Sequence, residues 1–134
     1  ILGFQEYRRF VMLPGPDGSI IKWLQSTESG GLAFIIMDPR QVIPDYIIHL
    51  KPNELTELAA TDVSQLEVYT LVVVPEDHSK IRTNLKAPLL INRKHRLGKQ
   101  TILERSNYPI QYYLAQEQPG RQASEEATHA RADA

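Results

Sequence analysis

Residues 68–74 constrain the fold more than any other part of this 134-residue chain, because their apolar side chains alternate to both sides of an extended backbone. The two sets are Val68, Val72 and Val74 on one face and Tyr69, Leu71 and Val73 on the other. A strand that is apolar on both faces needs a covering layer on each, so we expect this one at the centre of a sheet. Pro75 ends it, since proline has no N–H to donate to a neighbouring strand.

Other short runs are rich in β-forming residues, at 9–13, 32–37, 46–50, 89–92 and 100–104. Turn-forming residues separate these runs, at 14–18, 29–31, 38–39 and 97–98. Short strands at such spacing predict a mainly β fold, an antiparallel barrel or sandwich-like single domain.

One short helix is expected at residues 53–60. Asn53 can cap it by accepting a backbone N–H bond, and Glu54 lies near the positive end of the helix dipole. A narrow apolar stripe follows, made of Leu55, Leu58 and Ala59. We expect this helix to cover one end of the barrel.

The last part of the chain differs in composition from the rest. Residues 115–134 contain no aromatic residue and no aliphatic residue larger than Ala other than proline, and they are rich in Gln, Glu and Arg. Such a segment cannot bury enough surface to offset the entropy lost on ordering. We therefore expect a folded domain at 1–114 and a disordered polar tail at 115–134, with one domain in all, as the length suggests.

The sequence offers little chemistry. Without cysteine there is no disulfide, thiolate or Cys-ligated zinc, and the histidines, at 49, 78, 95 and 129, lack metal-ligand spacing. No serine nucleophile elbow or glycine-rich phosphate loop occurs, so we expect no cofactor, no metal and no enzyme activity. One alternative is a small hydrolase that uses Glu76-Asp77-His78 as an acid–base cluster, although three polar residues after a strand are more often an exposed turn.

Charge is distributed unevenly along the chain. Residues 1–77 hold 11 Asp and Glu against 5 Lys and Arg, whereas residues 78–105 hold 8 Lys and Arg against Glu104 alone. A basic segment can bind RNA phosphates, so a direct RNA-binding β-barrel is a second alternative. No Phe, Tyr or Trp lies between Lys80 and Arg105 to stack on bases, and this weakens that alternative. No apolar run approaches the ~18 residues that cross a bilayer, so we expect no membrane association and a cytoplasmic protein.

The motif richest in information is Thr-Asn-Leu-Lys-Ala-Pro-Leu-Leu-Ile-Asn at 83–92, followed by Arg-Leu-Gly-Lys-Gln-Thr-Ile-Leu at 96–103. This block resembles the FliW family of bacterial flagellar assembly factors, whose members carry N-L-x-A-P-I-V-I-N and then G-x-Q-x-I-L. Further matches occur in the family's order, at Gly3-Phe4-x-Glu6-Tyr7, Trp23-Leu24-Gln25-Ser26, Ala33-Phe34-Ile35-x-x-Asp38-Pro39 and Pro44-Asp45-Tyr46. The resemblance covers roughly residues 1–114.

The resemblance implies a regulator that binds two proteins. FliW-like proteins bind flagellin, the filament subunit, and the translational repressor CsrA. While flagellin is plentiful it occupies the FliW-like protein; once flagellin is exported, the freed protein binds CsrA and relieves repression of flagellin mRNA. The family usually has strand-forming sequence before the Gly3-Phe4 block, so the resemblance also implies missing N-terminal strands.

The matching blocks supply candidate partner-binding residues, which are Asn84, Leu85, Lys86, Pro88, Asp38, Pro39, Tyr46 and Gln100. Structural roles compete with this prediction. Asn84 can fix an irregular turn by bonding neighbouring backbone, and Asp38-Pro39 and Pro44-Asp45 can simply end strands. Trp23, the single tryptophan, is an interface anchor if exposed and a core residue otherwise.

Overall fold

A computed structural model describes residues 9–28 and 30–115 of the chain. Within these residues the strands are β1 Phe10–Pro14, β2 Ile21–Ser26, β3 Ala33–Met37, β4 Glu67–Val73, β5 Arg82–Thr83, β6 Leu89–Asn92, β7 Leu97–Gln100 and β8 Tyr112–Tyr113. The helix α1 spans Pro52–Glu57, and three short 3-10 helices are η1 Pro39–Gln41, η2 Val63–Gln65 and η3 His78–Lys80. The mainly β fold with one short helix is confirmed.

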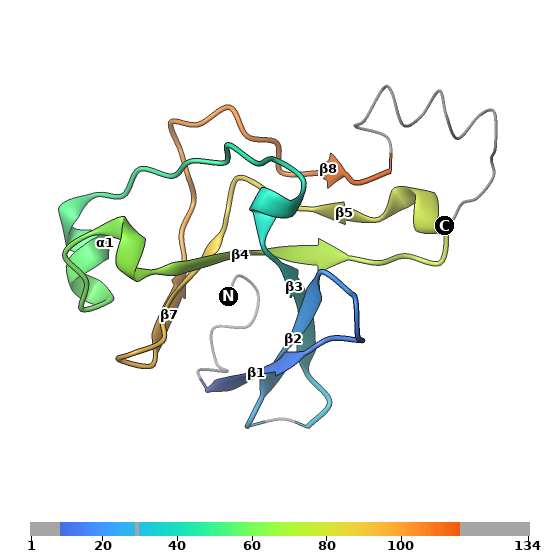
Figure 1. Cartoon of the computed structure of the whole chain (residues 1–134), viewed down its shortest axis with the longest axis horizontal. Coiled ribbons are helices and arrows are strands. Elements are labelled where there is room, and N and C mark those ends of the chain that lie inside the picture. Colours follow the sequence, from blue (N-terminus) through green and yellow to red (C-terminus); the bar gives the residue numbers. More distant parts are fainter. Residues whose placement is uncertain (1–8, 29, 116–134) are drawn as a thin grey trace.

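Strand β4 is central, as predicted, and crosses the middle of the molecule (Figure 1). Its first half pairs antiparallel with β6, with Val68 opposite Leu90. Its second half pairs antiparallel with β3 and β5, so that Val72 lies opposite both Ile35 and Thr83. Beyond Val72 the strand is no longer buried on both faces, because Val73 is 47% exposed and the Val74 that follows is 43% exposed.

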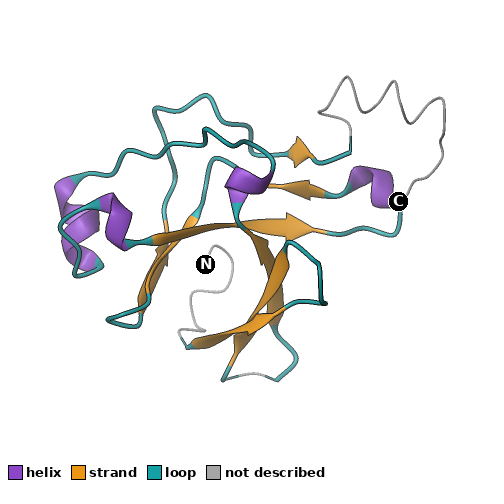
Figure 2. Ribbon diagram, viewed as in Figure 1, coloured by secondary structure: helices purple, strands orange, loops and turns teal. Residues whose placement is uncertain are grey.

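The sheet is continuous but branched (Figure 2). One path runs β1-β2-β3-β4-β5-β8, and β6 and β7 branch from β4. Among the described residues no pairing joins β1 or β8 to β7, so an antiparallel sheet is present without closure into a barrel. Because the sheet is not shown to close, the prediction that α1 covers the end of a barrel is not supported. Helix α1 lies beyond one end of β4 (Figure 1).

Two hydrophobic clusters form on opposite faces of β4. Val68 belongs to the larger one, composed of Tyr46, Ile48, Leu58, Ala60, Leu66, Val68, Leu85, Leu90 and Leu103. Tyr69 belongs to the smaller one, with Leu24, Ile36 and Leu89. Since successive side chains of a strand point to opposite faces, this placement is the physical reason for the doubly apolar sequence of β4.

The strand predicted at residues 46–50 is wrong. The chain there is extended and Tyr46 and Ile48 are buried, while Ile47 is 58% exposed, so the side chains alternate as in a strand. No neighbouring strand pairs with it among the described residues, and the backbone N–H of Ile47 donates instead to Tyr108 Oη at 2.9 Å. The alternation in the sequence therefore indicated an extended backbone correctly, but it did not imply a hydrogen-bonded neighbouring strand.

The predicted strand at residues 100–104 is displaced. Strand β7 begins at Leu97, so Gly98 lies inside it and the turn occupies residues 93–96, where Arg96 has φ 58°. Gly98 faces Ile91 in the ladder, and a Cβ there would lie 3.3 Å from the carbonyl oxygen of Leu90. Glycine stands here because the two strands approach each other closely. In the sequence alone, such a glycine cannot be told from one that marks a turn.

The helix is shorter than predicted and is capped differently. Lys51, not Asn53, is the N-cap, Pro52 takes the first helical position, and Glu54 Oε1 accepts the Lys51 N–H at 3.1 Å. The helix ends at Glu57 because Ala59 adopts φ 54°, a left-handed conformation that stops helical hydrogen bonding. Ala59 is therefore exposed, and the buried alanine of this turn is Ala60.

Three strands were not predicted: β2, β5 and β8. The latter two contain only two residues each, too few for a period to be recognised. The prediction that N-terminal strands are missing from this chain is not tested by the structure, and nearly all of the predicted tail lies outside the described residues.

Candidate protein-binding site

The motif at residues 83–92 is held in shape by its own polar groups. Asn84 Oδ1 accepts the backbone N–H of Lys86 at 3.0 Å and of Ala87 at 3.2 Å. An amide that bonds the backbone two and three residues ahead fixes an irregular turn. The structural alternative for Asn84 is the one that this geometry supports.

The second half of the motif packs on the first. The backbone N–H of Leu103 donates to the Lys86 carbonyl at 2.8 Å, and the Gln100 amide donates to the Ala87 carbonyl at 3.0 Å. The Lys86 ammonium donates to the Ser106 carbonyl at 2.8 Å. Side chains that bond a backbone carbonyl stabilise a loop whose carbonyls have no strand partner.

Tyr46 joins the motif from a distant part of the sequence. Its hydroxyl donates to the Leu85 carbonyl at 2.6 Å, and its ring packs on Tyr108 with centroids 4.5 Å apart. Burial raises the pKa of the Tyr46 phenol above its ordinary value, so the hydroxyl stays protonated and remains a donor. Tyr108 in turn accepts the N–H of Ile47, so the two tyrosines connect three loops.

Asp38 and Pro39 shape the neighbouring turn. The Asp38 carboxylate accepts the backbone N–H of Arg40 at 2.9 Å and so caps η1. Pro39 is buried at the first turn of that helix. The cap directs the chain from β3 toward Tyr46.

The candidate residues fall into two groups by exposure. Leu85, Pro88, Pro39 and Tyr46 are buried, whereas Asn84, Lys86, Asp38 and Gln100 are half-buried. The structure brings Tyr46, Leu85 and Asn84 together, and Asp38 and Pro39 begin the turn that leads into this cluster. The buried group forms framework in this conformation, and a role for either group in partner contact stays a prediction.

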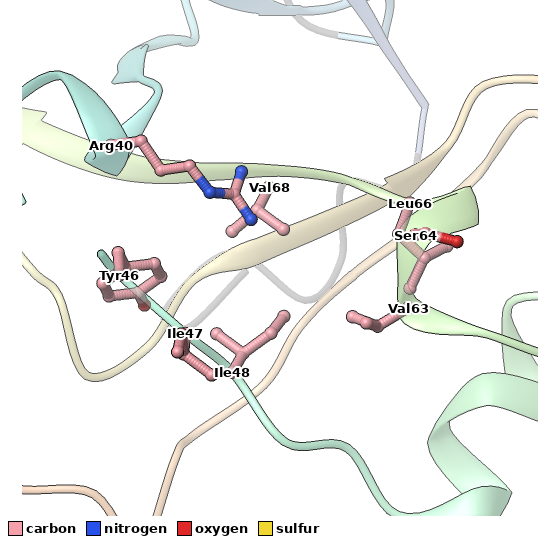
Figure 3. A pocket seen from close by; sticks show the side chains of 8 residues that line it. All are labelled: Arg40, Tyr46, Ile47, Ile48, Val63, Ser64, Leu66 and Val68. Carbon is pink, nitrogen blue, oxygen red and sulfur yellow. The ribbon is translucent and has the colours of Figure 1, made fainter. Parts of the chain in front are cut away.

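A groove opens beside this framework (Figure 3). It has a volume of about 390 Å³, which falls at the lower end of the ~300–1,000 Å³ range of ligand pockets. Its lining residues are Arg40, Tyr46, Ile47, Ile48, Val63, Ser64, Leu66 and Val68. Only Tyr46 among them was predicted as a site residue. Adjacent isoleucines at 47 and 48, one of which must face outward in an extended chain, are the sequence signal that could have marked it.

The basic segment is partly neutralised within the fold. Arg93 forms a two-pronged contact with Glu67, at 2.6 and 2.8 Å, and this hydrogen bonding lowers the pKa of the Glu67 carboxyl. Lys99 lies 2.6 Å from Glu57 and 4.0 Å from Glu54, so it ties β7 to α1. Lys94 and Arg96 are exposed in the hairpin turn. The segment is therefore no uninterrupted cationic surface.

The cluster at residues 76–78 forms an exposed turn. The Asp77 carboxylate accepts the backbone N–H and the hydroxyl of Ser79, at 3.1 and 2.7 Å, and so caps η3. The hydrogen bond from Ser79 lowers the pKa of Asp77. His78 is exposed within η3, and no group of three or more His, Cys, Asp or Glu side chains in the described part of the chain could hold a metal ion.

No helix among the described residues has the length and apolar character to cross a membrane.

Trp23 lies on an outer face of the sheet and is 37% exposed. It stands between Leu13 of β1 and Ile35 of β3 in register, so three apolar side chains form a row across adjacent strands. Leu13 is 42% exposed. The tryptophan is thus not a fully buried core residue.

Comparison with known proteins agrees with the sequence blocks. The family model described as FliW protein matches residues 1–114. The chain is 39% identical over 118 residues to a flagellar assembly factor FliW of Alkaliphilus metalliredigens, covering 87% of this chain and 73% of that protein. It is also 39% identical over 114 residues to a flagellar assembly factor FliW of Caldicellulosiruptor saccharolyticus, covering 85% and 74%. A crystal structure of the flagellar assembly factor FliW superposes with a TM-score of 0.78 at 34% identity, covering 87% of this chain and 81% of the other.

Proposed function

The chain belongs to the FliW family of flagellar assembly factors, and from this membership we propose that it works by holding two proteins in turn, flagellin and the translational repressor CsrA. An assembly factor of this family is not an enzyme. In the proposed cycle, abundant flagellin occupies the protein, and export of flagellin frees it to bind CsrA. Bound CsrA no longer represses flagellin mRNA. The cycle takes place in the cytoplasm, where subunits wait for export and mRNA is translated.

The observation that carries the proposal is the extent of the match, since the family model spans 114 residues and the superposed crystal structure covers 87% of the chain. The described residues add support of a second kind. They contain a mainly β fold with a groove whose lining is largely apolar, which is a surface that a partner protein could contact.

We further propose that partners contact the surface around the motif at residues 83–92. The half-buried candidates, which are Asn84, Lys86, Asp38 and Gln100, would touch the partner. The buried candidates, which are Leu85, Pro88, Pro39 and Tyr46, would hold that surface in shape. The division of the chain into a domain at 1–114 and a polar tail belongs to the same proposal.

Direct RNA binding has less support. Two of the basic side chains in the 78–105 segment, Arg93 and Lys99, are engaged by acidic residues of the same chain. Non-specific RNA affinity depends on cations that can neutralise phosphates, so these two pairs reduce what the segment can offer.

Size-exclusion chromatography with purified CsrA tests the proposal. At micromolar concentrations the two proteins should elute together, and added flagellin should shift part of this protein into a flagellin-containing peak. Separate elution from both CsrA and flagellin would refute the proposed function.

A further inference from the structure

The groove beside Tyr46 has a floor and walls that suit an apolar side chain. Ile48, Leu66 and Val68 are 7%, 9% and 5% exposed, so they form its buried base. Ile47 is 58% exposed and leaves an apolar wall open to solvent. Removing such surface from water contributes about 25 cal/mol per Å², which favours an apolar occupant.

One cation lies in this apolar setting. Arg40 belongs to η1, and its side chain lines the groove together with Val68 (Figure 3). Among the described residues it forms no salt bridge and its side chain makes no hydrogen bond. Two carboxylates that are close to lining residues in the sequence are already engaged: Asp38 caps η1 at Arg40 N, and Asp62 accepts the N–H of Ser64 at 2.9 Å. Arg40 is exposed, and a guanidinium binds a carboxylate through paired hydrogen bonds, so its side chain is available to an acidic residue of a partner.

The backbone beside the groove is extended and unpaired. Within the described residues the N–H and C=O groups of Ile48, His49 and Leu50 make no hydrogen bond, although the side chains alternate as in a strand. An extended segment with unused backbone groups can pair with an added strand from another chain. This feature favours a peptide over a fatty acid, because a fatty acid has no groups to pair with a backbone.

We infer that this groove binds an extended segment of a partner protein that places an apolar side chain over Val68 and an internal Asp or Glu carboxylate on Arg40. The backbone of residues 48–50 pairs with the segment. The inference rests on the proposed function, since it assumes that the chain binds proteins, and it adds the chemistry of the bound segment and the residues that select it.

A random-peptide library displayed as N-terminal fusions tests the inference, because fused peptides offer only internal carboxylates. Selection on the protein should enrich peptides with an acidic residue next to apolar ones. Selection on Arg40→Glu should enrich basic residues at that position instead. Absence of enrichment, or the same charge preference on both proteins, would overturn the inference.

Affinity measurements on a selected acidic peptide sharpen the test. Arg40→Gln should weaken binding at least tenfold, and Ile47→Ser should also weaken it. The matched controls are Arg105→Gln, an exposed arginine outside the groove, and Ile110→Ser, where the isoleucine is 62% exposed and also outside. Both controls should bind as wild type does, with all thermal unfolding midpoints alike; equal affinity for Arg40→Gln and wild type would overturn the inference.

This outcome is separable from that of the proposed function. If CsrA and flagellin bind but no acidic peptide is selected, only the groove inference fails. If acidic peptides are selected while both proteins elute separately, the groove stands and the partners are different ones.

Discussion

At the scale of single residues, the hydroxyl of Tyr46 connects two parts of the chain that are 39 positions apart. Tyr46 is 2% exposed and Leu85, whose carbonyl it reaches, is 0% exposed. A buried carbonyl that loses its hydrogen-bond donor still carries the free-energy cost of its removal from water, and no hydrogen bond then offsets that cost. The same bond holds the motif turn against the loop that lines the groove.

Tyr46→Phe should therefore lower the free energy of unfolding by about 1–3 kcal/mol, because the ring is kept and only the donor is lost. Urea denaturation measures the change. The control is Tyr113→Phe, whose hydroxyl makes an exposed 3.3 Å contact with Gln111 and should matter by less than about 0.5 kcal/mol. Equal stability of the two variants would show that the Tyr46 bond is not structural.

The pair Glu67–Arg93 gives a pH-dependent signature. Hydrogen bonding from Arg93 lowers the pKa of Glu67 below its ordinary value of 4.5. A carboxyl whose pKa is lower in the folded state stabilises the fold above its unfolded pKa, and that contribution disappears as the pH falls through the folded value.

Glu67→Gln should thus destabilise the protein near neutral pH and make little difference once the pH falls below the lowered pKa of Glu67. Urea denaturation of both proteins across this pH range follows the difference. Arg93→Gln removes the other partner and should show the same dependence. A stability difference that grows toward acid pH would contradict the assignment.

At the scale of elements, α1 ends in a motif that normally contains glycine. The N–H of Ala60 donates to the Leu55 carbonyl at 2.9 Å and that of Ala59 to the Thr56 carbonyl at 3.0 Å, the two bonds of a Schellman ending. Ala59 sits at the left-handed position with φ 54°. For a residue with a Cβ atom, this conformation costs about 1–2 kcal/mol.

Ala59→Gly should raise the thermal unfolding midpoint and increase the free energy of unfolding by up to about 1 kcal/mol. Glycine removes the backbone strain of the folded state, but it also makes the unfolded chain more flexible, which offsets part of the gain. Ala60→Gly, one residue on, should lower stability, since Ala60 is 6% exposed and its methyl group packs in the core. If Ala59→Gly destabilises as much as Ala60→Gly, the helix does not end as described.

Alternation of apolar side chains predicted a strand correctly only where the extended segment also pairs with a neighbouring strand. The alternation of β4 predicted a paired strand correctly, whereas the same alternation at Tyr46, Ile47 and Ile48 indicated only burial, because none of the described strands pairs with that segment. Gly98 was misread as a turn since close strand approach and positive φ both select glycine. The site shows the same limit: motif residues were identified from their pattern, but the cation of Arg40 enters the groove through tertiary folding alone.

At the scale of the whole molecule, the basic segment distinguishes protein binding from RNA binding. Lys94 and Arg96 are exposed, while Lys99 is held by Glu57. Reversing Lys94 and Arg96 to Glu should change stability by no more than about 0.5 kcal/mol and should slow association with an oppositely charged protein. Stopped-flow mixing measures the rate. Tight RNA binding by the wild-type protein at physiological salt, lost in the double reversal, would instead favour the RNA-binding alternative.

The most direct test of partner switching is cell-free translation of a flagellin mRNA carrying its own leader, with CsrA added to repress it. The account predicts that this protein restores translation in proportion to its ratio to CsrA, and that added flagellin protein restores the repression. Translation that stays repressed at a molar excess of this protein over CsrA would contradict the account.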